Sequence, residues 1–121
     1  MYSQTVAEHI ANPRNVGELE NPSGKGDVTN EACRDRILLT IKIENNQITD
    51  AKVKALGCPP TIAAASVLTE LITGRPVTEA ASLSRQDVEK ALEYLPSTKK
   101  HCSLLAIDAL RAAIESSQRL N

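Results

Sequence analysis

Apolar and polar side chains alternate most regularly in residues 36–44, where every odd-numbered position from 37 to 43 is Ile or Leu. Successive side chains of a β-strand point to opposite faces, so this pattern predicts a strand with one buried face. Asn45-Asn46 predicts a turn, and the alternation in residues 47–56 predicts a second strand that completes a hairpin. A shorter strand is expected at residues 27–31, after a loop over residues 16–25.

Apolar residues recur at helical spacing in the segments before and after these strands in the sequence. Residues 2–11 predict a short helix that ends before Pro13, because the residue preceding a proline resists the helical region. After the hairpin, Pro59-Pro60 opens a helix that ends near Gly74, since proline is favoured in a first helical turn. Further helices are expected at residues 77–83, 84–92 and 103–120. The pattern predicts an α+β fold, a small antiparallel sheet packed with an N-terminal helix and a C-terminal group of helices.

Length and composition are typical of one soluble domain over residues 1–121, with 41% apolar and 24% charged residues. A net charge of -1 gives no field that would favour nucleic acid or a membrane as partner. Two Tyr, without Phe or Trp, leave few rings for base stacking. No apolar run is long enough to span a bilayer, and no signal peptide is visible. The three cysteines, an odd number, predict reduced thiols in the cytoplasm rather than a disulfide framework.

The segment before the last predicted helix carries the densest candidate chemistry. Thr98 or Ser97 is expected to cap that helix, which places Cys102 in its first turn beside His101. Unpaired backbone amides, the helix dipole and the ammonium groups of the two preceding lysines predict a thiolate at Cys102. These lysines oppose the dipole of their own helix, so we expect them to serve the thiolate or a partner.

The other two cysteines also stand at the ends of predicted elements, Cys33 before a strand and Cys58 at a strand-to-helix corner. Asp35 follows Cys33 by two residues, so both side chains can face one way in an extended segment. No cysteine belongs to a C-x-x-C pair, and a free cysteine is often only a small buried apolar residue. Asp35 could equally be a solvated turn residue and His101 a surface residue. Placement at element ends, where functional groups are displayed, favours a site. His9 has no chemical neighbour in the sequence and is expected on the surface.

Four short motifs follow one another along the chain: Asn12-Pro13-Arg14-Asn15-Val16-Gly17, Ala32-Cys33-Arg34-Asp35, Gly57-Cys58 and His101-Cys102-Ser103-Leu104-Leu105-Ala106. Each is weak alone, but the ordered set resembles the IscU/NifU-type scaffold proteins of iron–sulfur cluster assembly over essentially the whole chain. The resemblance implies a three-stranded antiparallel sheet capped by helices, with the three cysteines converging at one end.

Carried over by position, Cys33, Cys58 and Cys102 would be the thiols that bind the cluster, with Cys102 the expected acceptor of sulfur. Asp35 would keep the cluster transferable, and His101 would be an occasional ligand of zinc or iron. Thiolates hold iron–sulfur clusters, whereas a harder oxygen or nitrogen ligand binds less firmly. The resemblance implies a scaffold without turnover chemistry, a monomer or weak homo-oligomer. It would take sulfur from a cysteine desulfurase and pass a transient 2Fe–2S cluster to acceptor apoproteins.

The chain departs from the family pattern at three places. Arg34 stands where the family usually has glycine, and Pro59-Pro60 replaces small residues after the second cysteine. The family's Leu-Pro-Pro-Val-Lys segment, read by a dedicated Hsp70-type chaperone, is here Leu95-Pro96-Ser97-Thr98-Lys99. This change weakens the expectation of contact with that chaperone and with the standard desulfurase.

Other functions are compatible with the same residues. The protein could be a stable zinc-binding domain, because zinc accepts tetrahedral sets of Cys, His and Asp ligands, and metal content would identify it. It could be a persulfide carrier in which Cys102 alone reacts, and then Cys33→Ser and Cys58→Ser would keep full persulfide acceptance. It could also be an interaction module with incidental thiols.

Overall fold

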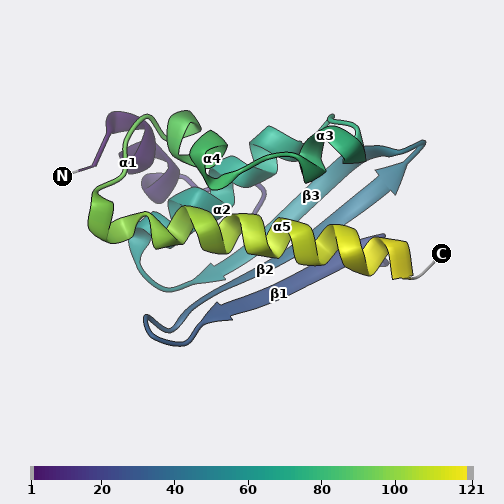
Figure 1. Cartoon of the computed structure of the whole chain (residues 1–121), viewed down its shortest axis with the longest axis horizontal. Coiled ribbons are helices and arrows are strands. Elements are labelled where there is room, and N and C mark those ends of the chain that lie inside the picture. The colour runs from purple at the N-terminus through teal and green to yellow at the C-terminus, as the bar shows by residue number, and fades with distance from the viewer. Residues whose placement is uncertain (1, 120–121) are drawn as a thin grey trace.

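The computed structural model describes residues 2–119, in which one sheet is combined with helices at both ends of the chain (Figure 1). The strands β1, β2 and β3 pair antiparallel in that order, which confirms the predicted α+β class. The elements in chain order are α1 (Gln4–Ala11), β1 (Gly24–Asn30), β2 (Asp35–Glu44), β3 (Gln47–Leu56), α2 (Pro59–Ile72), α3 (Val77–Ala81), α4 (Arg85–Ala91), the 3-10 helix η1 (Ser97–Lys99) and α5 (His101–Arg119).

The core lies between one face of the sheet and the helices that cover it. α5 packs along β1 and β2, while α2 packs on β3 and on α5, and in Figure 1 α5 runs lengthwise in front of the sheet. The core-facing residues of β2, Ile37, Leu39 and Ile41, are each 0% exposed. These are three of the four odd-numbered positions whose burial the alternation predicted, and the fourth, Ile43, is partly buried. The starts of β2, α2 and α5 come together at one end of this arrangement, which is where the candidate site forms.

β1 begins three residues earlier than expected, at Gly24 instead of residue 27. Glycine has low strand propensity, so the sequence pattern predicted a loop here. The close approach of α5 explains the difference. A Cβ atom at Gly24 would lie 2.1 Å from the carbonyl oxygen of Ala113, and one at Gly26 would lie 2.1 Å from that of Ala109. The two glycines therefore let the backbone of β1 lie directly against the backbone of α5.

The expected cap of the last helix at Thr98 or Ser97 is wrong. Both residues lie in η1, and α5 begins at His101 instead of residue 103. The Lys99 amide donates to the Pro96 carbonyl at 2.8 Å, a short-range bond that closes η1 before the α-helical ladder starts. Cys102 nevertheless lies in the first turn of α5, as predicted.

His9 is not on the surface, as the sequence suggested, but buried, with 5% of its area exposed. It lies one turn after Val6 on the face of α1 that packs against α2. Its Nδ1 atom is 2.7 Å from Ser66 Oγ, and Ser66 Oγ also accepts the Arg14 backbone N–H at 2.8 Å. The contacts of Ser66 with His9 and Arg14 thus link α1 and the following loop to α2.

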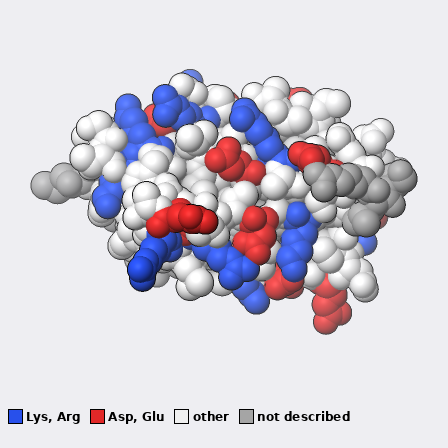
Figure 2. All heavy atoms as spheres, turned by 60° about the horizontal axis from the view of Figure 1, so that its bottom comes forward, with Lys and Arg blue, Asp and Glu red and all other residues white. Residues whose placement is uncertain are grey.

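Charged side chains of both signs are interspersed over the face that Figure 2 shows. Across the first strand pair Arg36 contacts Asp27 at 2.6 Å. Glu18, in the preceding loop, lies 3.3 Å from Lys25 and 3.5 Å from Lys54. Within residues 2–119, none of the helices combines the length and the apolar character that crossing a bilayer demands.

Candidate metal site

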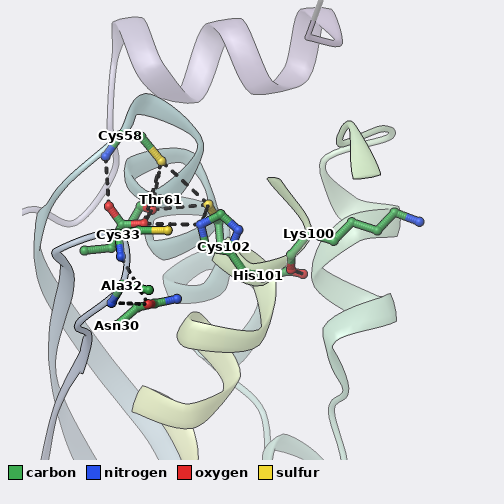
Figure 3. A network of polar contacts seen from close by, with 10 residues as sticks. Asn30, Ala32, Cys33, Cys58, Thr61, Lys100, His101 and Cys102 are labelled. Carbon is green, nitrogen blue, oxygen red and sulfur yellow. Dashed lines mark hydrogen bonds and ion pairs between the residues drawn. The ribbon is translucent and has the colours of Figure 1, made fainter. Parts of the chain in front are cut away.

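Five predicted site residues converge from three separate parts of the chain (Figure 3). Cys33 lies in the turn before β2, and Asp35 is the first residue of that strand. Cys58 is the N-cap of α2, as expected for a residue ahead of Pro59-Pro60. His101 and Cys102 open α5. Each residue stands at an element boundary, so the packing of α2 and α5 on the sheet sets the arrangement of the whole group.

The ligand atoms form two overlapping groups that share Asp35, each compact enough to hold a metal ion. Cys58 Sγ is 3.7 Å from Cys102 Sγ and 3.8 Å from Asp35 Oδ2. His101 Nε2 lies 3.6 Å from Cys102 Sγ and 3.5 Å from Asp35 Oδ2. Cys33 joins Asp35 and His101 in a second group whose ligand atoms all lie within 4.8 Å of one another. Ligands about 2.3 Å from a tetrahedral ion are about 3.8 Å apart, so little movement would be needed to enclose a cation.

Asp35 is a buried carboxylate, with 1% of its area exposed, and not a solvated turn residue. Its Oδ1 accepts the backbone N–H of Cys58 at 3.1 Å, and its Oδ2 accepts the hydroxyl of Thr61 at 2.9 Å. Gly57 makes room for it, because a Cβ at Gly57 would lie 2.0 Å from Asp35 Oδ1 and φ is +137° there. The carboxylate is therefore held at the N-terminal end of α2, where the helix dipole favours negative charge.

The pKa of the Cys102 thiol is raised to about 12, chiefly by burial and to a smaller extent by Cys58 and Asp35, while the Thr61 hydrogen bond lowers it. The predicted thiolate is therefore wrong for these surroundings, because desolvation outweighs the helix end. Lys100 does not offset the burial. Its ammonium lies 3.9 Å from Glu89 Oε1, and Figure 3 shows the side chain extending away from Cys102. A bound divalent cation would favour the deprotonated sulfur instead.

The three thiols differ in exposure, since Cys33 is exposed, Cys58 is half-buried and Cys102 is buried. Asn30 organises the exposed turn, because its Oδ1 accepts the backbone N–H groups of Ala32 at 3.1 Å and Cys33 at 3.3 Å. Arg34 is exposed and adopts a left-handed conformation with φ of 59°, which a glycine would adopt without strain. The site is thus open at Cys33 and closed at Cys102.

Thr61 also belongs to the candidate site, although the sequence analysis did not identify it. It is 0% exposed, and its hydroxyl contacts Asp35 Oδ2, Cys58 Sγ and Cys102 Sγ. The available signal was its spacing, because a residue three positions after the N-cap turns back toward that cap. Its contacts with Asp35 and Cys102 depend on tertiary packing, so the local sequence does not predict them.

The family of the chain follows from comparison with known proteins. The profile of the family described as NifU-like N terminal domain matches residues 1–120. The chain belongs to this family, which confirms the resemblance found in its motifs.

Individual relatives agree with this assignment. The chain is 45% identical over 121 residues to "Iron-sulfur cluster assembly scaffold protein IscU 1" of Archaeoglobus fulgidus, covering 100% of this chain and 79% of the relative. It is also 45% identical to "Iron-sulfur cluster assembly enzyme IscU" of Drosophila melanogaster, covering 94% of this chain and 76% of the relative. A NifU-like protein (N-terminal) from Brucella abortus shares the fold, with a TM-score of 0.80 over 98% of this chain and 95% of that one at 19% identity.

Proposed function

We propose that this protein is a scaffold on which an iron–sulfur cluster is built and from which the cluster passes to acceptor apoproteins. One observation carries the proposal: neighbouring thiol, carboxylate and imidazole groups contact one another at 3.5–3.8 Å, in two overlapping groups that share Asp35. The relatives named as cluster assembly scaffolds support the same function.

Cys33, Cys58 and Cys102 are the proposed thiolate ligands, and Asp35 and His101 are the hard ligands that make release possible. Thiolates bind iron and sulfide firmly, while carboxylate oxygen and imidazole nitrogen hold iron less firmly. Because Cys33 is exposed and Cys102 is buried, a 2Fe–2S unit here would have one solvent-facing edge, through which sulfur arrives and the cluster leaves.

Iron enters before sulfur in this proposal. The raised pKa of Cys102, about 12, makes its thiol a poor nucleophile. A ferrous ion bound to Asp35 and Cys58 would deprotonate it. The Cys102 thiolate then attacks the outer sulfur of a cysteine persulfide on the desulfurase, so one S–S bond forms, another breaks and the donor leaves as a thiolate. Two electrons from an external electron-transfer protein reduce the resulting persulfide to sulfide and thiolate.

The proposed partners are a cysteine desulfurase and acceptor apoproteins, with the scaffold acting as a monomer or weak homo-oligomer. The Drosophila relative is named an enzyme, but we assign to this chain a carrier role without turnover chemistry of its own. Transfer driven by an Hsp70-type chaperone receives no support from the altered segment at residues 95–99. Free thiols as ligands suit the reducing cytoplasm.

A stable zinc site is the second candidate, favoured by the near-tetrahedral spacing of Asp35, Cys58 and Cys102. Zinc differs from the proposed cargo in having no redox chemistry and no sulfide requirement. Metal analysis before and after incubation with ferrous iron, cysteine and desulfurase separates the two. Zinc that stays at one equivalent throughout supports the stable zinc domain, and zinc replaced by iron and sulfide supports the scaffold.

Replacement of Cys58 by Ser tests the scaffold directly. Cys58 contacts both Cys102 and Asp35, so Cys58→Ser should reduce cluster retention at least about tenfold, since a hydroxyl is a poor ligand for iron at neutral pH. The measurement is iron and acid-labile sulfide per chain after anaerobic assembly. Far-ultraviolet circular dichroism shows whether the variant is folded. Iron and sulfide equal to wild type in the folded variant would refute the assignment.

A further inference from the structure

Thr61 is the one buried hydroxyl, among the residues described, that contacts the cluster of proposed ligands. It lies in the first turn of α2, three residues after Cys58, and is 0% exposed. Its Oγ1 is 2.9 Å from Asp35 Oδ2, 3.3 Å from Cys58 Sγ and 3.3 Å from Cys102 Sγ. In Figure 3 Thr61 lies between Cys58 and Cys102. One side chain thus touches three of the five groups proposed to hold the metal.

The hydroxyl has one proton and two lone pairs, which fixes how these contacts are used. Asp35 Oδ2 is the closest partner and the strongest acceptor, so Thr61 donates its proton to the carboxylate. Cys102 Sγ, at 3.3 Å, is the alternative acceptor of this proton, and either atom can be the donor in the 3.3 Å contact with Cys58 Sγ. A β-branched side chain in a helix has few χ1 rotamers available, so the hydroxyl is held in place by α2 itself.

Asp35 has two oxygens, and the structure fixes each in a different way. Oδ1 is held by the backbone N–H of Cys58 and by the close approach of Gly57. Oδ2 is the oxygen that faces Cys58 Sγ and His101 Nε2, and its shortest hydrogen bond, at 2.9 Å, comes from Thr61. Without the Thr61 hydroxyl, the oxygen aimed at the cation would lose its closest hydrogen-bond donor and keep only the long contact with Cys58 Sγ, while Oδ1 would keep its own donor.

We propose that Thr61 is a positioning residue of the metal site, which orients Asp35 Oδ2 and the sulfurs of Cys58 and Cys102 toward a common cation. This inference rests on the proposed function, because it assigns a role around the same site. Groups that orient metal ligands typically change affinity about 10- to 100-fold when removed. Loss of the hydroxyl should therefore weaken binding of a divalent cation by about that factor.

A purely structural role for Thr61 makes a different prediction. Thr61→Val keeps the volume and branching of the side chain but removes the hydroxyl, whereas Thr61→Ser keeps the hydroxyl and removes a methyl group. If Thr61 only fills space, the serine variant is the more damaged of the two. If Thr61 positions ligands, the valine variant loses affinity and the serine variant retains it.

The test is an anaerobic titration of the purified full chain and its variants with Co²⁺. Binding is monitored by the sulfur-to-cobalt charge-transfer absorption. Competition with a chromophoric chelator gives Zn²⁺ affinity on the same samples. Thr69→Val is the matched control, because Thr69 is also a 0% exposed threonine of α2 and donates instead to the Ser66 carbonyl at 2.6 Å. We expect 10- to 100-fold weaker binding and altered charge-transfer bands for Thr61→Val alone.

Two results would overturn the inference. One is a folded Thr61→Val variant with wild-type affinity and wild-type bands. The other is a Thr61→Ser variant that loses as much affinity as Thr61→Val. Because Co²⁺ binding does not require cluster assembly, the proposed function can fail separately. Wild-type protein that binds Co²⁺ through Thr61-dependent ligands but never holds iron and sulfide would refute the scaffold and leave Thr61 its role.

Discussion

At the scale of single residues, the site depends on a carboxylate that is buried rather than solvated. Asp35 receives hydrogen bonds from the Cys58 backbone and from Thr61, and the missing Cβ of Gly57 leaves space for it. A buried carboxylate with both oxygens hydrogen-bonded has a fixed direction. A fixed carboxylate suits a cargo that is held only weakly. Its oxygen already faces the site before iron binds, and because it is a hard ligand, it exchanges readily.

His9 gives a prediction for pH. Burial is the main cause that lowers its pKa, and the charge of Arg14 lowers it as well, against smaller opposite effects of Glu70 and Glu8. Ser66 faces the same ring. The His9 imidazole therefore binds a proton more readily in the unfolded chain than in the folded protein. Its contribution to the free energy of unfolding is full above about pH 6.5 and is lost as the pH falls below that value.

Urea unfolding at pH 7.5 and at pH 5.5 measures the effect. Wild type should lose more free energy of unfolding on acidification than His9→Asn, whose amide oxygen can accept the Ser66 hydroxyl without titrating. Equal losses for both proteins would show that His9 does not carry this pH dependence.

At the scale of elements, the contact of β1 with α5 decides where the first turn of α5 lies relative to the sheet. Gly24 and Gly26 leave no side chain between the two backbones. The same two elements carry site residues to one end, since β1 leads into the Cys33 turn and α5 begins with His101. Backbone contact far from the cysteines therefore helps to set the distance across the site.

Substitution of Gly26 by Ala tests this contact. The added Cβ would meet the Ala109 carbonyl at 2.1 Å, so α5 must shift, and overpacking of this kind costs about 1–3 kcal/mol of unfolding free energy. Lys25→Ala is the control, because the side chain of Lys25 is exposed and such changes stay within about 0.5 kcal/mol. Chemical denaturation measures both variants. A Gly26→Ala protein as stable as the Lys25→Ala protein would contradict the role of the close approach.

At the scale of the whole molecule, sequence patterns predicted those elements whose formation depends on the local periodicity of apolar residues. The strands β2 and β3 followed from alternation, and the corner at Cys58 followed from Pro59-Pro60. β1 was misplaced because its glycines serve a tertiary contact. The role of Thr61, the burial of Asp35 and the raised pKa of Cys102 all arise from α2 and α5 meeting the sheet, so no local pattern contains them.

The architecture gives the site a graded exposure, from the exposed Cys33 turn to the buried Cys102 at the head of α5. A resident cofactor would be enclosed more completely, whereas a cargo requires a way in and a way out. The exposed turn that carries Cys33 connects β1 to β2, so the solvent-facing side of the site lies at a surface connection and not among the core strands. This graded exposure therefore suits a cluster that is held only temporarily.

Anaerobic transfer from cluster-loaded protein to a 2Fe–2S apo-ferredoxin, monitored by visible circular dichroism, tests whether the cluster is held only temporarily. We expect the ferredoxin spectrum to appear while iron and sulfide on this protein fall in parallel. A cluster that stays on this protein for hours beside excess acceptor, or a colourless protein that keeps its zinc, would contradict this expectation.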